Sequence, residues 1–276
     1  MVKKVVIEGA GTAIPPLGLG TYPLTGREAE DVIVMAIELG YRHIDTAQMY
    51  GNEAAVGNAL RRSPVPRDQL FVVTKVEPGN LSAQRFASSV ARSVDDLGGP
   101  PDLMLIHWPP ADSEVDAAID RLVSALEEGK ARHIGVSNFT IALMERALKR
   151  TGGRIICNQV EFHPLLDQSR LLAAARELGI MLTAYSPLAR GRALQPTIIQ
   201  EIARKLGRPP SEIVLRWIIQ QGVAAIPMSR KRENLQSNLN VLQFTLSEKD
   251  MTALSSIGSA AGRTVSRASM SGRWDS

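Results

Sequence analysis

Four residues with chemically useful side chains fall at or just after the ends of short apolar runs. Asp45, Lys75 and His107 each end such a run, and Tyr50 follows Asp45 by five residues. In a parallel α/β barrel the carboxyl ends of the strands open onto one mouth, where active sites are built. We therefore expect these four side chains to meet, although they are far apart in the sequence.

Their chemistry indicates a site that protonates a carbonyl oxygen. A lone charge at the end of an apolar strand is costly to bury, and pairing Lys75 with Asp45 would offset that cost. An ammonium beside a phenol favours the phenolate, so we expect the pKa of Tyr50 to lie below its usual value of about 10. Tyr50 would then act as a general acid near neutral pH, and His107 would donate a hydrogen bond to the same oxygen. Such a site needs a hydride donor for the carbonyl carbon.

The elements that must position these residues alternate between strand-like and helix-like patterns. Between the strands, apolar residues recur at helical spacing, as at Val32, Ile33, Ala36 and Ile37. Eight alternations predict an α/β fold of the (β/α)8 TIM barrel type rather than an open sheet. The expected strands are Leu17–Thr21, Tyr41–Asp45, Leu70–Lys75, Asp102–His107, His133–Ser137, Ile156–Gln159, Ile180–Tyr185 and Ala224–Met228.

The two ends of the chain fall outside this alternation. Val2–Pro16 is expected to form an N-terminal β-hairpin that plugs the bottom of the barrel, and Gly262–Ser276 a C-terminal tail over its mouth. The Gly9-Ala10-Gly11 turn is not a dinucleotide-binding loop, because Pro15 and Pro16 block the helix that such a loop requires. We expect residues 1–276 to form a single barrel domain.

Composition narrows the class of protein. The chain has 276 residues, and its hydrophobic content of 44% is ordinary for a globular protein. Its net charge is +4, but the basic residues are mostly spread along helical segments, and a nucleic-acid-binding face would need them clustered. Cys157 is the single cysteine, so neither an internal disulfide nor a cysteine zinc cluster is expected, and we predict no metal site. With no signal peptide and no apolar run of about 20 residues, we expect a cytoplasmic monomer without a membrane partner.

Ordered motifs cover nearly the whole chain: Gly18–Thr21, Gly40–Ala47 with Tyr50–Glu53, Val73–Lys75, Leu105–Pro109, Gly135–Phe139, Asn158–Glu161 and Ala184–Leu188. On these motifs the chain resembles the aldo-keto reductase family, and within it the bacterial 2,5-diketo-D-gluconate reductases of the B type. The resemblance implies an NADP-dependent oxidoreductase that reduces carbonyl groups to alcohols.

The resemblance also assigns roles to residues. It implies that Tyr50 is the proton donor, that Lys75 and Asp45 tune it, and that His107 orients the substrate. Tyr22 and Trp108 would form walls of the substrate pocket beside Tyr50 and His107. The C-terminal tail would place Trp274 or one of its arginines near the substrate. An amide ring substituent would be held at the ends of the fifth and sixth strands, and Tyr185 would stack on the ring. The implied NADP-binding residues are Thr21, Ser137, Asn138, Gln159, Tyr185, Ser186, Pro187, Leu188, Ser229, Arg230, Lys231, Asn234 and Asn238.

The segment for the cofactor's 2′-phosphate departs from the family pattern. A Lys-Ser pair with an Arg five residues after the Ser is common there, whereas this chain has Met228, Ser229 and Asn234 at those positions. Arg230–Arg232 follow directly, at what we expect to be a helix N-terminus capped by Ser229. The helix dipole disfavours cations there, so their presence indicates a bound anion. We expect NADPH to be preferred over NADH, but by a smaller factor than in relatives that have both the usual lysine and the usual arginine.

The expected substrates are small aldehydes, 2-oxoaldehydes or keto sugar acids. Two alternatives remain open at the level of the sequence. A Schiff-base enzyme on the same fold would use Lys75 as its nucleophile. A non-catalytic NADP(H)-sensing subunit would bind the cofactor without turning it over.

Overall fold

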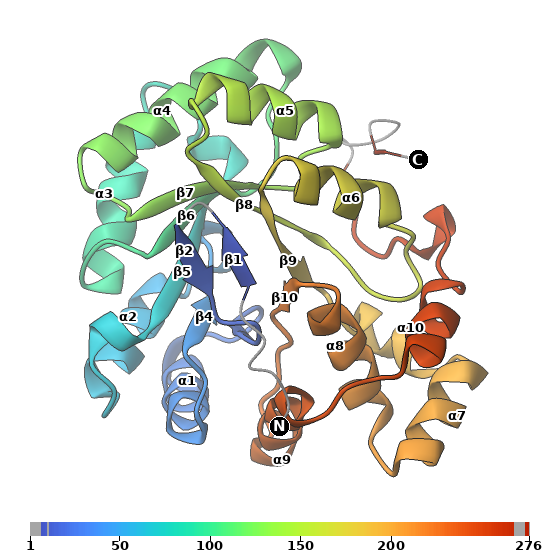
Figure 1. Cartoon of the computed structure of the whole chain (residues 1–276). Coiled ribbons are helices and arrows are strands. Elements are labelled where there is room, and N and C mark those ends of the chain that lie inside the picture. Colours follow the sequence, from blue (N-terminus) through green and yellow to red (C-terminus); the bar gives the residue numbers. More distant parts are fainter. Residues whose placement is uncertain (1–6, 10, 268–273, 276) are drawn as a thin grey trace.

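The computed structural model describes residues 7–9, 11–267 and 274–275, in which eight parallel strands curl into a barrel surrounded by helices (Figure 1). Each strand is hydrogen-bonded to the next one along the chain. The eight predicted strands are present, although several begin or end at other residues than expected. They are β3 (Leu19–Gly20), β4 (His43–Asp45), β5 (Phe71–Val76), β6 (Leu103–Ile106), β7 (His133–Ser137), β8 (Ile155–Glu161), β9 (Met181–Tyr185) and β10 (Val223–Ala225).

The barrel closes where β3 meets β10. Leu17 forms a parallel bridge with Ala225, and the Gly18 amide donates to the Ala225 carbonyl over 2.8 Å. A Cβ atom at Gly20 would lie 2.7 Å from the carbonyl oxygen of Ile226, so this seam accepts no side chain there. The closed (β/α)8 barrel predicted from the sequence is confirmed.

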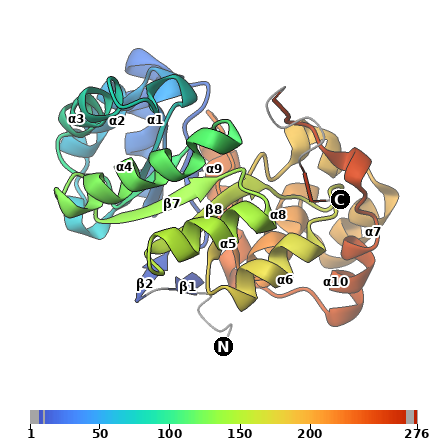
Figure 2. The same cartoon turned by 90° about the horizontal axis from the view of Figure 1, so that it is seen from above.

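Helices cover the outside of the barrel. In α1 the apolar residues recur at helical spacing and face the strands, with Ala29, Val32, Ile33, Ala36 and Ile37 all buried. From above, α4, α5 and α6 lie side by side along β7 and β8 (Figure 2). No helix in the described part of the chain is long and apolar enough to span a membrane. The helices are α1 (Gly26–Leu39), α2 (Glu53–Arg62), α3 (Phe86–Leu97), α4 (Val115–Glu127), α5 (Ile141–Arg150), α6 (Ser169–Glu177), α7 (Thr197–Leu206), α8 (Pro210–Gln220), α9 (Arg232–Leu239) and α10 (Glu248–Ser255).

The N-terminal hairpin fills the bottom of the barrel. Strands β1 (Ile7–Gly9) and β2 (Thr12–Ile14) pair antiparallel. Their Ile7 and Ile14 side chains are buried in a separate cluster with residues that face the barrel interior. The predicted plug is therefore confirmed for these strands, and the part of that prediction on residues 2–6 and 10 lies outside the described residues.

The chain after α10 runs to the mouth of the barrel, at the end opposite to the N-terminal hairpin. Residues 263–267 reach the mouth, where the amides of Thr264 and Val265 bond to Glu161 at the end of β8. Farther on, the Asp275 carboxylate accepts from the backbone amide of Ile141, at the start of α5. The predicted tail over the mouth is present for residues 263–267, and its residues 268–273 and 276 lie outside the described part.

Candidate active site

A buried ion pair lies beneath the mouth of the barrel. The Lys75 Nζ atom donates to Asp45 Oδ1 over 2.6 Å, to the Thr46 carbonyl over 2.8 Å and to the Tyr50 hydroxyl over 3.3 Å. The other Asp45 oxygen accepts from Gln159 Nε2 at 2.7 Å. Burial acts most strongly, and in the direction that lowers the pKa of Lys75, but the Asp45 charge, the neighbouring Tyr50 and the hydrogen bonds to both together outweigh it, and the pKa is raised. Lys75 is therefore a fixed ammonium, as the sequence predicted.

The loop that carries Tyr50 is tied down by its own residues. Tyr50 ends a short 3₁₀ helix (Gln48–Tyr50), and Gly51 then takes a left-handed conformation (φ 63°) that lets the chain turn into α2. The buried Asn52 side chain donates to the carbonyl of Leu24 over 2.8 Å and to the hydroxyl of Thr21 over 3.2 Å. These bonds fix the Tyr50 loop to the end of β3.

The electrostatics of Tyr50 differ from the prediction. Burial raises the pKa of its phenol, and the nearby Lys75 charge, which acts in the opposite direction, does not cancel that effect. The expectation of a lowered pKa is wrong, because the sequence showed the ammonium but not how far the fold removes the phenol from water. A raised pKa keeps the phenol protonated at neutral pH, which is the form that a proton donor needs.

His107 follows β6 and faces Tyr50 edge to face. The two ring centroids lie 5.7 Å apart with an interplanar angle of 80°. Burial first, and then the charges of Lys75 and Arg267, lower the pKa of His107 to about 2. The imidazole is therefore neutral, and a neutral imidazole retains one N–H that can donate a hydrogen bond.

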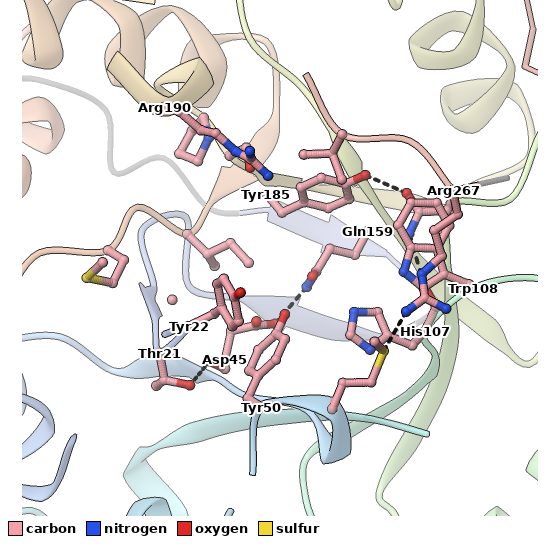
Figure 3. A pocket seen from close by; sticks show the side chains of 18 of the residues that line it. Thr21, Tyr22, Asp45, Tyr50, His107, Trp108, Gln159, Tyr185, Arg190 and Arg267 are labelled. Carbon is pink, nitrogen blue, oxygen red and sulfur yellow. Dashed lines mark hydrogen bonds between the residues drawn. The ribbon is translucent and has the colours of Figure 1, made fainter. Parts of the chain in front are cut away.

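A cavity of about 480 Å³ opens at the carboxyl ends of the strands (Figure 3). Lys75 is not in its wall but lies directly behind Asp45 and Tyr50. On one side the exposed ring of Tyr22 packs against Tyr50, with centroids 5.2 Å apart. The predicted site residues that the fold brings together here are Thr21, Tyr22, Asp45, Tyr50, His107, Trp108, Asn138, Gln159, Tyr185, Ser186 and Pro187.

Amide and hydroxyl groups border an aromatic ring along the opposite wall. Asn138 Nδ2 donates to the His107 carbonyl over 3.0 Å, and its Oδ1 accepts from the Tyr185 hydroxyl over 2.7 Å. Ser137 does not line the cavity; its hydroxyl donates to the Gln159 carbonyl and accepts from Asn138. Ser137 thus supports the wall from behind.

The other predicted cofactor residues lie outside the lining of this cavity. Leu188 packs against the hydrophobic core, and Asn238 is buried on α9 where it bonds to Tyr41. Asn234 is exposed on the same helix. The Arg230 guanidinium donates to the Glu28 carboxylate of α1 over 2.7 Å.

The predicted cap of α9 is also wrong in detail. The helix begins at Arg232, so its N-cap residue is Lys231, whose side chain makes no capping bond. The Ser229 hydroxyl instead accepts from the Lys231 amide over 3.1 Å in the preceding turn. Because Lys231 is extended and the helix starts only at Arg232, Ser229 lies before the N-cap position from which a side chain could cap the helix.

Several residues that line the cavity were not assigned from the sequence. Met49 and Arg190 are close in sequence to Tyr50 and Leu188, so nearness to a predicted residue could have found them. Gly20 directly precedes the predicted Thr21, at the end of β3, and could have been found in the same way. The others come from the turn after β10 or from the C-terminal segment, for which the sequence predicted only that Trp274 or one unspecified arginine would lie near the substrate. The unassigned lining residues are Gly20, Met49, Arg190, Ile226, Met228, Val265, Ser266 and Arg267.

With this geometry in view, comparison with known proteins decides the family. The family model described as Aldo/keto reductase family matches residues 16–259. The chain belongs to the aldo-keto reductase family. This aldo-keto reductase is 41% identical over 267 residues to methylglyoxal reductase DkgB of Escherichia coli O157:H7, covering 95% of this chain and 100% of that protein. It is 38% identical over 253 residues to an aldo-keto reductase of Mycolicibacterium smegmatis, covering 90% of each.

Solved structures agree with this assignment. A crystal structure described as a 2,5-diketo-D-gluconic acid reductase B superposes with a TM-score of 0.95 at 37% identity, over 98% of this chain and 97% of that one. An aldo/keto reductase of Brucella melitensis superposes with a TM-score of 0.87 at 34% identity, over 91% and 98%. The resemblance inferred from the motifs is confirmed. This aldo-keto reductase is an oxidoreductase that acts on carbonyl groups, in a family that generally uses NADP(H).

Proposed function

We propose that this protein is an NADPH-dependent reductase of small aldehydes, 2-oxoaldehydes or keto sugar acids, with Tyr50 as the proton donor. The observation that carries the proposal is the contact between Tyr50 and Lys75: a part-buried, protonated phenol lies 3.3 Å from a fixed ammonium in the wall of a cavity that His107 also lines. The names of two similar proteins fit these classes. One is a methylglyoxal reductase and the other is described as a 2,5-diketo-D-gluconic acid reductase.

The wall formed by Asn138, Gln159 and Tyr185 fits a nicotinamide ring. Tyr185 offers a flat face, and the two neighbouring amides suit a carboxamide substituent. Asn138 and Ser186 hold left-handed backbone conformations, with φ of 63° and 46°. Such conformations cost energy in residues other than glycine and tend to occur at functional sites. When bound there, NADPH supplies the hydride for the carbonyl carbon.

The protein's part in the reaction follows from the remaining residues. A carbonyl oxygen placed between Tyr50 and His107 accepts a hydrogen bond from the neutral imidazole and the proton from the phenol. The Lys75 ammonium then stabilises the phenolate left on Tyr50. Asp45 and the Thr46 carbonyl hold Lys75 in the orientation that this requires.

The bonding of Lys75 argues against the Schiff-base alternative. A nucleophilic lysine must be neutral and open to substrate. Lys75 is 0% exposed, donates to three oxygens and has a raised pKa, so it is neither. Trapping with borohydride in the presence of an aldehyde tests this directly, because only a Schiff base leaves a reduced adduct on Lys75.

Turnover separates the reductase from a sensing subunit. Purified protein, NADPH and a panel of aldehydes, 2-oxoaldehydes and keto sugar acids are mixed, and the loss of NADPH absorbance is compared with the alcohol formed. We expect one alcohol for each NADPH consumed. NADPH binding, measured by quenching of protein fluorescence, without oxidation by any carbonyl compound would replace the proposal with the sensing role.

A further inference from the structure

A cation from the C-terminal segment lies at the mouth of the cavity. Arg267 lines the cavity together with Tyr50 and His107, and its guanidinium carbon lies 5.4 Å from the centroid of the Trp108 ring (Figure 3). Its Nη2 atom lies 3.3 Å from the sulfur of Met49. Among the described residues no carboxylate pairs with this guanidinium.

The partners of Arg267 leave most of its hydrogen-bonding capacity unused. A guanidinium has five N–H donors in a planar fork, and a thioether sulfur is only a weak acceptor. The fork matches a carboxylate, which can accept two parallel N–H bonds. Arg267 also lies close enough to His107 for its charge to help lower the pKa of that imidazole, after burial and Lys75. An anion bound to Arg267 would therefore lie beside the residues that act on the carbonyl oxygen.

Arg267 is held at the mouth by a buried carboxylate. Glu161 ends β8 and is 0% exposed. Its Oε1 accepts from the Thr264 amide over 2.8 Å and also from the Thr264 hydroxyl, and its Oε2 accepts from the Val265 amide over 3.0 Å. His163 Nε2 lies 3.0 Å from Oε1. Burial acts to raise the pKa of Glu161, but these bonds outweigh it and the pKa is lowered. Both carboxylate oxygens thus bind the backbone just before Arg267.

Close packing fixes the start of the same segment. A Cβ atom at Gly262 would lie 1.7 Å from the carbonyl oxygen of Leu165, so the chain passes this point without room for a side chain. One residue on, the Arg263 guanidinium carbon lies 3.7 Å from the centroid of the Trp274 ring, which packs against Trp108. Residues 262–265 are therefore held against the barrel by the close packing of Gly262 on Leu165 and by the bonds of Thr264 and Val265 to Glu161.

Arg190, the other arginine in the cavity wall, lies at a different end of the cavity from Arg267. It belongs to the 3₁₀ segment after β9 (Ala189–Leu194), next to Ser186 and Pro187 in the lining. In Figure 3 Arg190 lies on the far side of Tyr185 from His107, whereas Arg267 lies beside Trp108 and His107. Only Arg267 is next to the expected position of the carbonyl.

We propose that Arg267 binds a carboxylate on the substrate, so that this reductase prefers carbonyl compounds that carry a carboxylate, and that Glu161 is the positioning residue that holds Arg267 in place. This inference rests on the proposed function. The acidic member of the substrate classes named above is then the favoured one, and neutral aldehydes are weaker substrates. Specificity comes from a charge on the C-terminal segment rather than from the barrel itself.

The test compares 4-oxobutanoate with its methyl ester, which has the same aldehyde and chain but no charge. We expect a higher kcat/KM for the acid in the unaltered protein. Arg267→Gln should lower the acid-to-ester ratio of kcat/KM by about tenfold or more, since it removes a charge-assisted pair, and the loss should fall mainly on the KM for the acid. Arg190→Gln, which removes a charge from the same cavity, is the control and should leave the ratio unchanged.

A second arm tests Glu161. Glu161→Gln places an amide where two backbone N–H groups now donate, so the acid-to-ester ratio should fall as in Arg267→Gln. If Glu161 acts through Arg267, the double variant should show the same ratio as Arg267→Gln alone. Thr264→Val, which removes only the hydroxyl contact, gives a milder version should Glu161→Gln fail to fold, and it should shift the ratio in the same direction.

The outcomes separate this inference from the proposed function. Equal losses for acid and ester in Arg267→Gln, or an unaltered protein that favours the ester, would overturn the carboxylate site while leaving carbonyl reduction intact. A double variant with a further loss in the ratio would overturn the positioning role of Glu161. No oxidation of NADPH with either compound would instead reject the proposed function.

Discussion

The Lys75 ammonium donates to the Asp45 carboxylate over 2.6 Å inside the barrel, where the two side chains are 0% and 2% exposed. Each charge is tolerated there because the other is present. Gln159 satisfies the second Asp45 oxygen, and the Thr46 carbonyl and Tyr50 take further Lys75 donors. The pair that tunes the proposed proton donor is therefore also a structural element of the barrel.

Lys75→Met should destabilise the fold markedly. It leaves the Asp45 carboxylate buried without its counter-charge, and breaking a buried pair in this way costs about 3–5 kcal/mol. Urea unfolding followed by circular dichroism measures the loss. The double variant Lys75→Met/Asp45→Leu, in which no charge remains, should recover part of it. A single variant as stable as the unaltered protein would show that the pair is not needed for folding.

Tyr50→Phe should lower kcat by about a hundredfold or more, the scale of general acid catalysis. The ring and its packing against His107 are kept, and only the hydroxyl 3.3 Å from Lys75 is lost. Binding of NADPH should be largely kept. Tyr22→Phe, at the neighbouring ring, is the matched control, since its hydroxyl has no role in proton transfer. Near-normal turnover by Tyr50→Phe would remove Tyr50 as the donor.

Reduction should be insensitive to pH over the range in which histidines usually titrate. His107 has its pKa lowered to about 2, so it is neutral throughout, and the raised pKa of Tyr50 keeps the donor proton in place until the solution is strongly alkaline. We expect kcat/KM for carbonyl reduction to be flat from about pH 5 to 8 and to fall only above about pH 10. A limb in the profile near pH 6.5 that disappears in His107→Gln would contradict this.

Arg230 and Glu28 should act in opposite directions on cofactor choice. Arg230→Ala should weaken NADPH binding by about tenfold while leaving NADH nearly unaffected, because only NADPH carries the 2′-phosphate. Glu28 now pairs with Arg230 over 2.7 Å, so Glu28→Gln should free the guanidinium and strengthen NADPH binding. Both effects are read from dissociation constants measured by fluorescence titration. Parallel losses with both cofactors in Arg230→Ala, or a native preference for NADH, would reject the role of Arg230.

The sequence predicted the fold because the information is local. The spacing of apolar residues predicts each strand and each helix separately. Alternating strands and helices can bury these apolar residues in only a few architectures. The same reasoning placed Asp45, Tyr50, Lys75 and His107 at one mouth, since each lies at or just after the carboxyl end of a strand. Side chains at strand ends keep their place when the bounds of a strand move by a residue or two.

Predictions that depended on degree of burial or on a helix boundary were less successful. The pKa of Tyr50 is raised rather than lowered, because the balance between Lys75 and desolvation is set by how the surrounding loops close over the ring. Ser229 does not cap α9, because the helix begins after an extended Lys231. Neither fact is contained in the pattern of residue types.

The sequence by itself determined the barrel, the family and the four residues proposed to do the chemistry. Each of these was read from short stretches of sequence: the spacing within one element, or a motif of a few residues. What only the tertiary structure decided is the composition of the mouth. Glu161 at the end of β8 binds Thr264 and Val265, about a hundred residues later, and so brings Arg267 beside His107. A contact between such distant segments depends on packing and buried hydrogen bonds, which no local spacing encodes.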